Sequence, residues 1–165
     1  MRSRRLLFIL AACLVSLLSV WPAAAQTPIK LGDINSYSGI GAPFTGPYRA
    51  GVEMAVEEIN AKGGVLGRKL EVVFRDDKGQ PAEAVKHAQE LVESEKVALI
   101  AGSFLSNVGL AVSDWAKQNK TMFVVAEALT EALTWSKGHD YAVRLRPNTY
   151  EQGRMLAEKA GKMKY

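Results

Sequence analysis

The pattern of apolar and polar positions divides most of the chain into alternating strands and helices. Residues 29–34 alternate apolar and polar side chains, which is typical of a strand with one buried face. Residues 97–101 and 121–126 are continuously apolar, as expected for central parallel strands covered on both faces. The full prediction has strands at 29–34, 69–75, 97–101, 121–126 and 141–145, and helices at 48–61, 82–94, 108–118 and 149–162.

Several predicted helices carry a stripe of apolar residues at helical spacing, whereas the segment before the first helix does not. Residues 35–47 are rich in Gly and Pro, so we predict a loop there, and a helix only from residue 48. We expect the stripes to point inward. They are Val52, Ala55, Val56 and Ile59 in the first helix, Val85, Ala88, Leu91 and Val92 in the second, and Met155, Leu156 and Ala160 in the last.

The alternation of strands and helices predicts an α/β fold with a parallel sheet and helices on both faces. In such sheets, ligands bind beyond the carboxyl ends of the strands. The loops after Ile34, Phe74, Ala101 and Ala126 are therefore the places where we expect functional residues. The fold alone does not define a function, so the residues of these loops decide the chemistry.

The first 25 residues have the layout of a secretory signal peptide. Three arginines near the N-terminus precede an apolar run over residues 6–20, and three alanines offer a cleavage site before Gln26. The run is shorter than the roughly 20 apolar residues of a membrane-spanning helix. The alternatives are an uncleaved anchor and a lipoprotein signal, since Leu-Ala-Ala precedes Cys13. We predict a cleaved signal and a periplasmic protein.

The charge and cysteine content of the exported chain exclude several functions. Removing residues 1–25 removes three arginines and no acid, so the formal charge falls from +4 to +1. No strongly basic surface is then left to bind nucleic acid. The one cysteine, Cys13, lies in the signal, so the exported chain has neither a disulfide nor a thiol nucleophile. About 140 residues remain, which is enough for one domain.

The loop after the first strand, residues 36–46, is the richest in candidate chemistry. It matches no phosphate-binding motif: the dinucleotide fingerprint requires a glycine where Phe44 stands, and the Walker A motif requires a lysine where Pro47 stands. What remains is a hydroxyl-rich loop that carries the aromatic residues Tyr37 and Phe44. It either contacts a ligand or forms a surface turn with one aromatic side chain packed down.

Two further loops offer groups for an ionic ligand. Residues 102–107 follow a buried strand and open a helix, so Ser106 and the free backbone N–H groups suit a carboxylate. Alternatively, Ser106 or Asn107 only caps the helix. Glu127, after the fourth strand, suits an ammonium or hydroxyl group, or is a solvated acid at a helix start.

Other polar residues favour structural roles. Asp76 and Asp77 follow the second strand without histidine or cysteine neighbours, so a turn with a solvated acid is preferred to a metal site. His87 and His139 have no predicted partner for a metal site or a triad, and no nucleophile elbow is present. We therefore predict no metal, no cofactor, no catalytic residue and no enzymatic activity.

One pattern in the chain is specific enough to indicate a family. It reads G-x-E-x-A-x-x-x-I-N-A-K-G-G-x-x-G-x-x-L over residues 51–70, and the Asp pair, a Ser-Asp at 113–114 and the run 144–153 follow in register. The chain thereby resembles the branched-chain amino-acid-binding periplasmic proteins, the Leu/Ile/Val-binding family. These are substrate-binding components of ABC importers with the type I periplasmic-binding fold. The resemblance covers residues 29–163.

The resemblance implies a set of ligand-binding residues. Ser106 matches a serine that binds the ligand carboxylate, and Phe44 matches an aromatic residue that lines the side-chain pocket. The segment 127–129 matches one that holds the α-amino and carboxylate groups. With the neighbour of Ser106 included, the predicted ligand-binding residues are Ser106, Phe44, Glu127, Ala128, Leu129 and Asn107.

Two of these positions depart from the family pattern. The amino-acid binders of the family carry a hydroxyl where Leu129 stands and a small residue where Glu127 stands. Leu129 cannot bind a carboxylate through its side chain. The segments VAEALTEALTW and YAVRLRPNTY resemble a subgroup whose ligands include aromatic and other small organic acids. The predicted ligand is thus an amino acid or a related carboxylate.

The resemblance also implies a division of the chain and a role. We expect a signal peptide at 1–25, most of a ligand-binding lobe at 26–148, and the start of a second lobe at 149–165, as in the N-terminal piece of a longer protein. Hinge closure on the ligand would precede docking on an ABC permease in the inner membrane. The alternatives are a periplasmic sensor of the same fold, a non-functional truncated fragment, and a nucleotide-using α/β enzyme, which the failed phosphate motifs and export disfavour.

Overall fold

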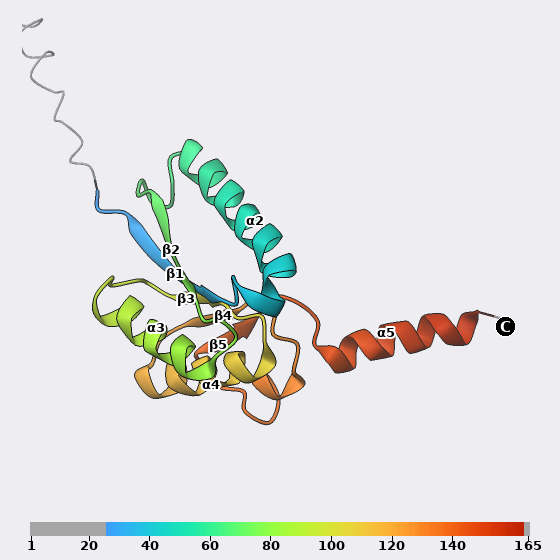
Figure 1. The fold of residues 1–165 in the computed structure, drawn as a ribbon. Coiled ribbons are helices and arrows are strands. Elements are labelled where there is room, and N and C mark those ends of the chain that lie inside the picture. The colour runs from blue at the N-terminus through green and yellow to red at the C-terminus, as the bar shows by residue number, and fades with distance from the viewer. Residues whose placement is uncertain (1–25, 164–165) are drawn as a thin grey trace, which may run out of the picture.

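The computed structural model of the protein describes residues 26–163, so the predicted signal peptide lies outside the described residues. Five strands form one sheet in the order β2-β1-β3-β4-β5, and all of its pairings are parallel (Figure 1). The predicted α/β class with a parallel sheet is confirmed. The strands are β1 (Ile29–Asn35), β2 (Leu70–Asp76), β3 (Ile100–Gly102), β4 (Phe123–Val125) and β5 (Ala142–Arg144).

Helices cover the two faces of the sheet unequally. The connection from β1 to β2 runs in one direction along the sheet and the connection from β2 to β3 runs back, which places α2 on one face and α3 and α4 on the other (Figure 1). The helices are α2 (Ala42–Ala61), α3 (Pro81–Glu93), α4 (Ser106–Asn119) and α5 (Thr149–Lys162), with short 3-10 turns η1 (Gly39–Gly41) and η2 (Glu131–Leu133).

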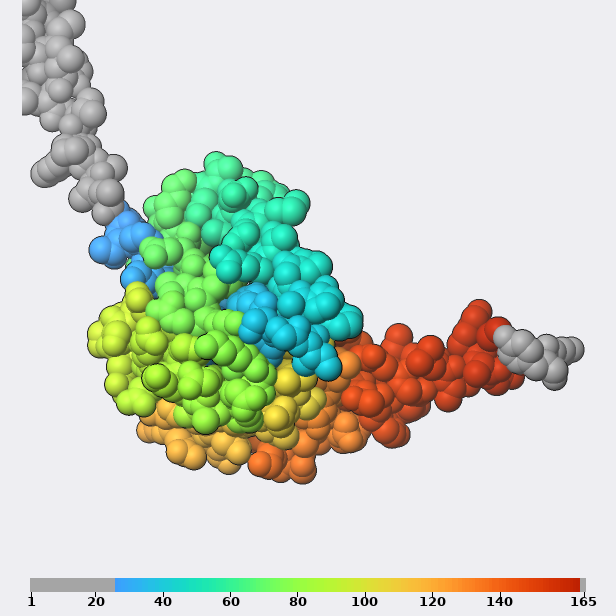
Figure 2. Space-filling view, viewed as in Figure 1, coloured from blue at the N-terminus to red at the C-terminus, as the bar shows by residue number. Residues whose placement is uncertain are grey.

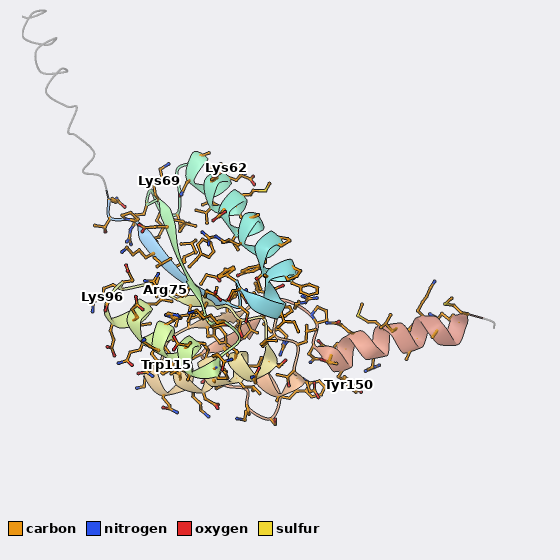
Figure 3. All side chains as sticks on the ribbon, in the orientation of Figure 1. Lys62, Lys69, Arg75, Lys96, Trp115 and Tyr150 are labelled. Atoms are coloured by element: carbon orange, nitrogen blue, oxygen red, sulfur yellow. The ribbon has the colours of Figure 1, made fainter. Side chains whose placement is uncertain are left out.

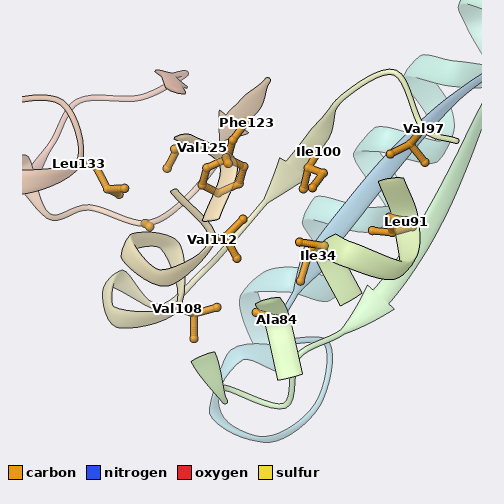
Figure 4. Close-up of a cluster of buried hydrophobic side chains, with 13 residues drawn as sticks. Ile34, Ala84, Leu91, Val97, Ile100, Val108, Val112, Phe123, Val125 and Leu133 are labelled. Carbon is orange, nitrogen blue, oxygen red and sulfur yellow. The ribbon is translucent and has the colours of Figure 1, made fainter. Parts of the chain in front are cut away.

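The hydrophobic core lies between the sheet and helices α3 and α4. Ile34, Ile100 and Phe123, one from each of the three central strands, are almost fully buried and face the helices (Figure 4). Leu91 of α3 and Val112 of α4 are buried against them. Burial of side chains of this size stabilises the fold by about 1.5–3 kcal/mol each. In α3 the fully buried positions are Ala84, Ala88 and Leu91, whereas the predicted Val85 and Val92 are half-buried.

The opposite face of the sheet is covered only in part. Helix α2 packs on β2 with Val52 and Val56 half-buried, and among the described residues no helix covers β5 on this side. Val143 of β5 is accordingly 47% exposed. The predicted inward stripe of α2 is therefore only half correct, because Ala55 and Ile59 are exposed.

Helix α2 begins six residues earlier than predicted, at Ala42 rather than at residue 48. Pro43 lies in the first turn, where the missing N–H costs no helical hydrogen bond, and the buried Thr45 hydroxyl donates to Ser36 O at 2.8 Å. Pro47 lies inside the helix. The sequence places Pro47 at the end of a loop because proline usually interrupts helices, but the helix continues through it.

Helix α5 projects from the body of the molecule (Figures 1 and 2), and only its first turn contacts the rest: the Tyr150 ring meets that of Trp135 edge to face, with the ring centroids 5.2 Å apart. A capping box starts it: Asn148 Oδ1 accepts from Glu151 N at 2.9 Å, and Glu151 Oε2 accepts from Asn148 N at 2.8 Å. The prediction of an inward stripe is wrong for this helix, because Met155 is 63% and Leu156 71% exposed and Ala160 is exposed too. Periodicity shows which face of a helix is apolar, but not whether anything covers it.

Candidate functional site

A hollow of about 370 Å³ lies at the carboxyl edge of the sheet, where the loops after the strands meet. Four of the six predicted site residues line it: Phe44, Ser106, Glu127 and Leu129. Ala128 is fully buried behind them, and Asn107 is exposed outside the lining. Sequence reasoning missed three further lining residues, Phe104, Leu105 and Arg146.

The apolar wall of the hollow is a pair of stacked aromatic rings. Phe44, in the first turn of α2, lies with its ring centroid 5.2 Å from that of Phe104, and the two ring planes differ by 17°. Phe44 is still 59% exposed, so the pair presents a broad apolar surface. Phe104 precedes α4 by two residues. Its position two residues before Ser106, in the same loop, was the feature of the sequence that could have indicated Phe104 as a lining residue.

The N-terminus of α4 faces the hollow without a side-chain cap. The N-cap residue is Leu105, which has no side-chain oxygen, so the prediction that Ser106 or Asn107 caps the helix is wrong. Ser106 is the first helical residue, and its Oγ accepts a hydrogen bond from Thr130 N at 3.2 Å. Its hydroxyl proton therefore stays available to a ligand, beside the first backbone N–H groups, which have no partner inside the helix. This end of a helix attracts anions.

Glu127 and Leu129 belong to a segment after β4 that hydrogen bonds hold from three sides. Glu127 Oε2 accepts from Asn35 Nδ2 at 3.3 Å, which ties it to the end of β1. Ala128 N donates to Ser103 O at 2.8 Å, and Leu129 O accepts from Thr149 N at 2.9 Å. Because these bonds fix the backbone, the Leu129 side chain is directed into the hollow.

Arg144, at the end of β5, fixes the same segment through its side chain. Its guanidinium donates to Ala128 O at 2.5 Å and also to Thr130 O. A charged donor strengthens such bonds, and the planar guanidinium group can donate two of them at once. Arg144 is thus a positioning residue, since it holds the backbone on either side of Leu129.

Replacing Arg144 with methionine should lower the free energy of unfolding by about 2 kcal/mol, because two carbonyl groups lose a charged donor. Lysine at this position should recover only part of the loss, because one ammonium group lacks the fork geometry. Urea denaturation measures both values. The matched control is Arg154→Met on exposed α5, and an equal loss in the control would contradict the role given to Arg144.

A buried carboxylate in β1 was not identified from the sequence. Asp33 of β1 is 1% exposed, and it accepts hydrogen bonds from Tyr37 Oη and Tyr48 Oη, each at 2.6 Å. Burial raises the pKa of Asp33 to about 6; the tyrosine bonds and Arg49 oppose the rise, and Glu127 adds to it. An aspartate in the middle of an apolar strand was the feature of the sequence that could have indicated it. Through its bond to Asp33, Tyr37 anchors the loop after β1 to the strand.

The pair Asp76 and Asp77 organises the loop that leads to Phe44. Asp76 Oδ1 accepts from Tyr37 N at 3.0 Å, and Asp77 Oδ1 accepts from Ser36 Oγ at 2.6 Å. Asp77 is fully buried, and this burial raises its pKa. The prediction of a turn with a solvated acid is wrong for Asp77, because its carboxylate is buried: Oδ1 accepts from Ser36 Oγ and Gly79 N, and Oδ2 is buried without a hydrogen-bond partner.

His139 also has a partner that the sequence did not indicate. Its Nδ1 accepts from Tyr141 N at 3.2 Å, which leaves the proton on Nε2, 2.9 Å from Ser113 Oγ. In this tautomer the imidazole donates to the serine and does not act as a base toward it. The pair links α4 to the loop that precedes β5. Among residues 26–163, no group of three or more potential ligands is placed to hold a metal ion.

The comparison with protein families covers nearly the whole described chain. A family model described as periplasmic binding protein matches residues 28–164. The chain belongs to the periplasmic binding protein family. Members and structural neighbours are solute-binding proteins and not enzymes. Within residues 26–163, no helix is both long enough and apolar enough to cross a membrane.

Individual relatives agree with this assignment. The Leu/Ile/Val-binding protein homolog 7 of Brucella abortus (strain 2308) is 34% identical over 149 residues, covering 90% of this chain and 37% of the relative. The branched-chain amino acid transporter substrate-binding protein LivJ of Streptococcus pneumoniae, solved with isoleucine, has 30% identity and a TM-score of 0.74, over 82% of this chain and 38% of LivJ. A solute-binding protein of R. palustris, solved with 4-hydroxybenzoate, has 31% identity and a TM-score of 0.70, and the match covers 82% of this chain and 37% of that protein.

The chain thus spans less than two fifths of the length of these relatives. The part that it shares with them contains one lobe of the type I periplasmic-binding fold, as predicted. The described residues place four of the predicted ligand-binding residues around one hollow in this lobe.

Proposed function

We propose that this periplasmic binding protein is the extracytoplasmic solute-binding component of an ABC importer and that it binds a small carboxylate. The observation that carries the proposal is the uncapped N-terminus of α4 at the hollow, where the Ser106 hydroxyl has its proton free. A carboxylate placed there gains backbone N–H donors, a hydroxyl donor and the favourable end of the helix dipole.

We also propose a division of the chain. Residues 1–25 are a cleaved signal peptide, 26–148 the first ligand-binding lobe, and 149–165 the start of a second lobe. The projection of α5 away from the sheet supports the last boundary, and Figure 3 shows Tyr150 at the point where α5 leaves the lobe. A second wall over the hollow would close on the ligand by hinge motion, and the closed protein would dock on an ABC permease.

Direct titration tests the proposal. The protein is expressed together with whatever its gene encodes beyond Tyr165. It is then titrated by calorimetry with isoleucine and with 4-hydroxybenzoate, two ligands seen in similar solved structures. We expect heat of binding from at least one of them, and none from the nucleotide ATP. Binding of ATP with no response to any carboxylate would overturn the proposal.

Replacing Ser106 with alanine should weaken the binding of the carboxylate ligand by about 1–3 kcal/mol, or roughly 5- to 150-fold in Kd. The reason is that a charge-assisted hydrogen bond is lost. Ser106→Thr keeps the hydroxyl and should restore most of the affinity. The control is Ser136→Ala, which changes an exposed serine elsewhere. An affinity unaffected by Ser106→Ala would assign Ser106 to the Thr130 contact alone.

A further inference from the structure

The strand β2 forms an open edge of the sheet. It stands first in the strand order, so among the described residues no strand pairs with its outer side (Figure 1). With seven residues it is longer than β5, the other edge strand, which has three. An edge strand of this length presents a row of backbone donors and acceptors with which another strand can pair.

The hydrogen bonds at the two ends of the β1–β2 pairing fix which backbone groups face outward. Lys69 O accepts from Ile29 N at 2.8 Å, and Asp77 N donates to Asn35 O at 3.0 Å. Successive residues of a strand direct their backbone groups to alternate edges, so the odd-numbered residues of β2 face β1. The residues that face outward are Leu70, Val72, Phe74 and Asp76.

The centre of this edge has free hydrogen-bonding groups. Asn60 occupies one end of the edge, because its side-chain amide accepts from Leu70 N at 2.7 Å and donates to Leu70 O at 2.9 Å. Within residues 26–163, no side chain bonds in this way to Val72 or to the N–H of Phe74. Phe74 O accepts from Arg75 Nη1 at 3.2 Å and keeps a second lone pair. Val72 and Phe74 are therefore able to pair with a strand from outside.

A second copy of β2 fits this edge in an antiparallel register. With a twofold axis at Val73, Val72 of each copy lies opposite Phe74 of the other, and the two residues exchange both N–H···O bonds. Val73, whose backbone groups face β1, lies opposite its own counterpart as a non-hydrogen-bonded pair. The alternation that antiparallel pairing requires is thus met without any change in β2.

The charged side chains of β2 favour the same register. Glu71 and Arg75 lie two residues before and after Val73, and Arg75 Nη2 donates to Glu90 Oε1 of α3 at 2.8 Å. The twofold axis places Glu71 of each copy opposite Arg75 of the other. Opposite charges directly across an antiparallel pair stabilise it. The five N–H groups of a guanidinium are enough for both acids.

The neighbouring registers bring like charges together. A shift of the axis to residue 72 places Lys69 opposite Arg75, and a shift to residue 74 places Glu71 opposite Asp77. Like charges directly opposite each other destabilise a pair of strands. Charged residues on an edge strand usually block pairing. On β2, however, their signs and spacing are self-complementary in the register centred on Val73.

The other face of β2 offers apolar surface to the same partner. A hollow of about 320 Å³ lies between α2 and β2, and its lining includes the half-buried side chains of Val72 and Phe74. The Arg49 guanidinium lies over the Phe74 ring, 4.3 Å from its centroid. In the paired arrangement, Val72 and Phe74 of the second copy lie next to these side chains, so apolar surface is buried on both sides of the axis.

We propose that two copies of this protein form a dimer by antiparallel pairing of their β2 strands about a twofold axis at Val73. The two five-stranded sheets then continue as one sheet across the interface. Twofold dimers, in which both subunits use the same surface, are the commonest oligomers. The inference goes beyond the proposed function, since no residue that lines the hollow at α4 takes part.

Sedimentation velocity on the protein, expressed with whatever its gene encodes beyond Tyr165, tests the dimer. At about 100 μM we expect twice the mass of one chain, with dissociation on dilution, because an interface of this small size binds weakly. Glu71→Lys places a positive charge opposite each Arg75 and should give the mass of one chain. The control Glu158→Lys makes the same charge change on exposed α5 and should leave the dimer unchanged.

A mixture of two variants tests the register. Arg75→Glu alone places two acids opposite each other and should also give the mass of one chain. Mixed in equal amounts, Glu71→Lys and Arg75→Glu again carry opposite charges across the axis, so they should form a heterodimer. Circular dichroism checks the folding of each variant, because Arg75→Glu also removes the bond to Glu90. If that variant is unfolded, Val72→Pro decides, because it removes only an outward N–H and should give the mass of one chain.

The outcomes separate this inference from the proposed function. A parent protein with the mass of one chain at about 100 μM would overturn the inference. A dimer that persists in Glu71→Lys or in Val72→Pro would overturn it as well, and so would folded variants that fail to associate when mixed. None of these results bears on ligand binding, which calorimetry measures separately.

Discussion

Replacing Gly102 with alanine should lower the free energy of unfolding by about 3–5 kcal/mol, a large part of the total stability of an ordinary domain. Gly102 ends β3 with a φ of 110°, which side chains rarely adopt. An added Cβ would lie 2.3 Å from Ile34 O and 3.0 Å from Asp33 Oδ1. The same carbonyl accepts from Ser103 N at 2.7 Å, so relief would separate β1 from β3. Urea denaturation measures the loss.

The matched control is Gly51→Ala in α2. Gly51 is exposed, and an added Cβ would meet no atom within 4 Å. Alanine in a helix interior is favoured over glycine by about 1 kcal/mol, so this variant should be slightly more stable than the parent protein. If Gly102→Ala unfolded at the same urea concentration as Gly51→Ala, the close contact between β1 and β3 would not exist as described.

Replacing Asp33 with asparagine should stabilise the protein at neutral pH by up to about 3 kcal/mol. Burial raises the pKa of Asp33 from 3.8 to about 6. Because the folded pKa lies above the unfolded value, the folded state keeps the proton to higher pH. The contribution of Asp33 to stability is therefore full below about pH 4, and it is lost as the pH rises through about 6. Asparagine has no charge to bury.

The measurement is the difference in free energy of unfolding between Asp33→Asn and the parent protein at several pH values. The variant should gain relative to the parent from pH 4 to pH 7 and level off above. Tyr48→Phe provides the second arm: it removes one hydrogen bond to the ionised carboxylate, so its stability should fall more steeply with pH than that of the parent. A difference that stays constant with pH would contradict the assignment to Asp33.

The strands and their loops could be predicted because their signals are local. A run such as residues 97–101 is apolar on both faces, and glycine or proline marks the loop after β1 and the turns before and after β2. The hollow followed from topology, since parallel strands bring their carboxyl ends to one edge. Phe44, Ser106, Glu127 and Leu129 therefore come together as expected, although their contact with a ligand stays a prediction.

The remaining features depend on partners distant in the sequence. The buried Asp33 and Asp77 accept hydrogen bonds from Tyr48 and Ser36, which lie 15 and 41 residues away along the chain, so nothing near either aspartate indicates these two donors. Arg144 and Arg146 differ in role although two residues separate them, because the first meets two carbonyl groups and the second meets the hollow. The early start of α2 depends on Thr45 reaching back to Ser36.

The central position of β1 in the sheet determines the order in which this lobe can fold. β1 is the first strand to be synthesised, yet it pairs with β2 on one edge and with β3 on the other. One edge of β1 stays unpaired until α2 and β2 have been made, and the other until α3 and β3 follow. Long-range pairings of this kind form slowly because a long loop must close first. The nascent chain thus stays without a finished sheet for much of its synthesis, which suits the export that we propose for it.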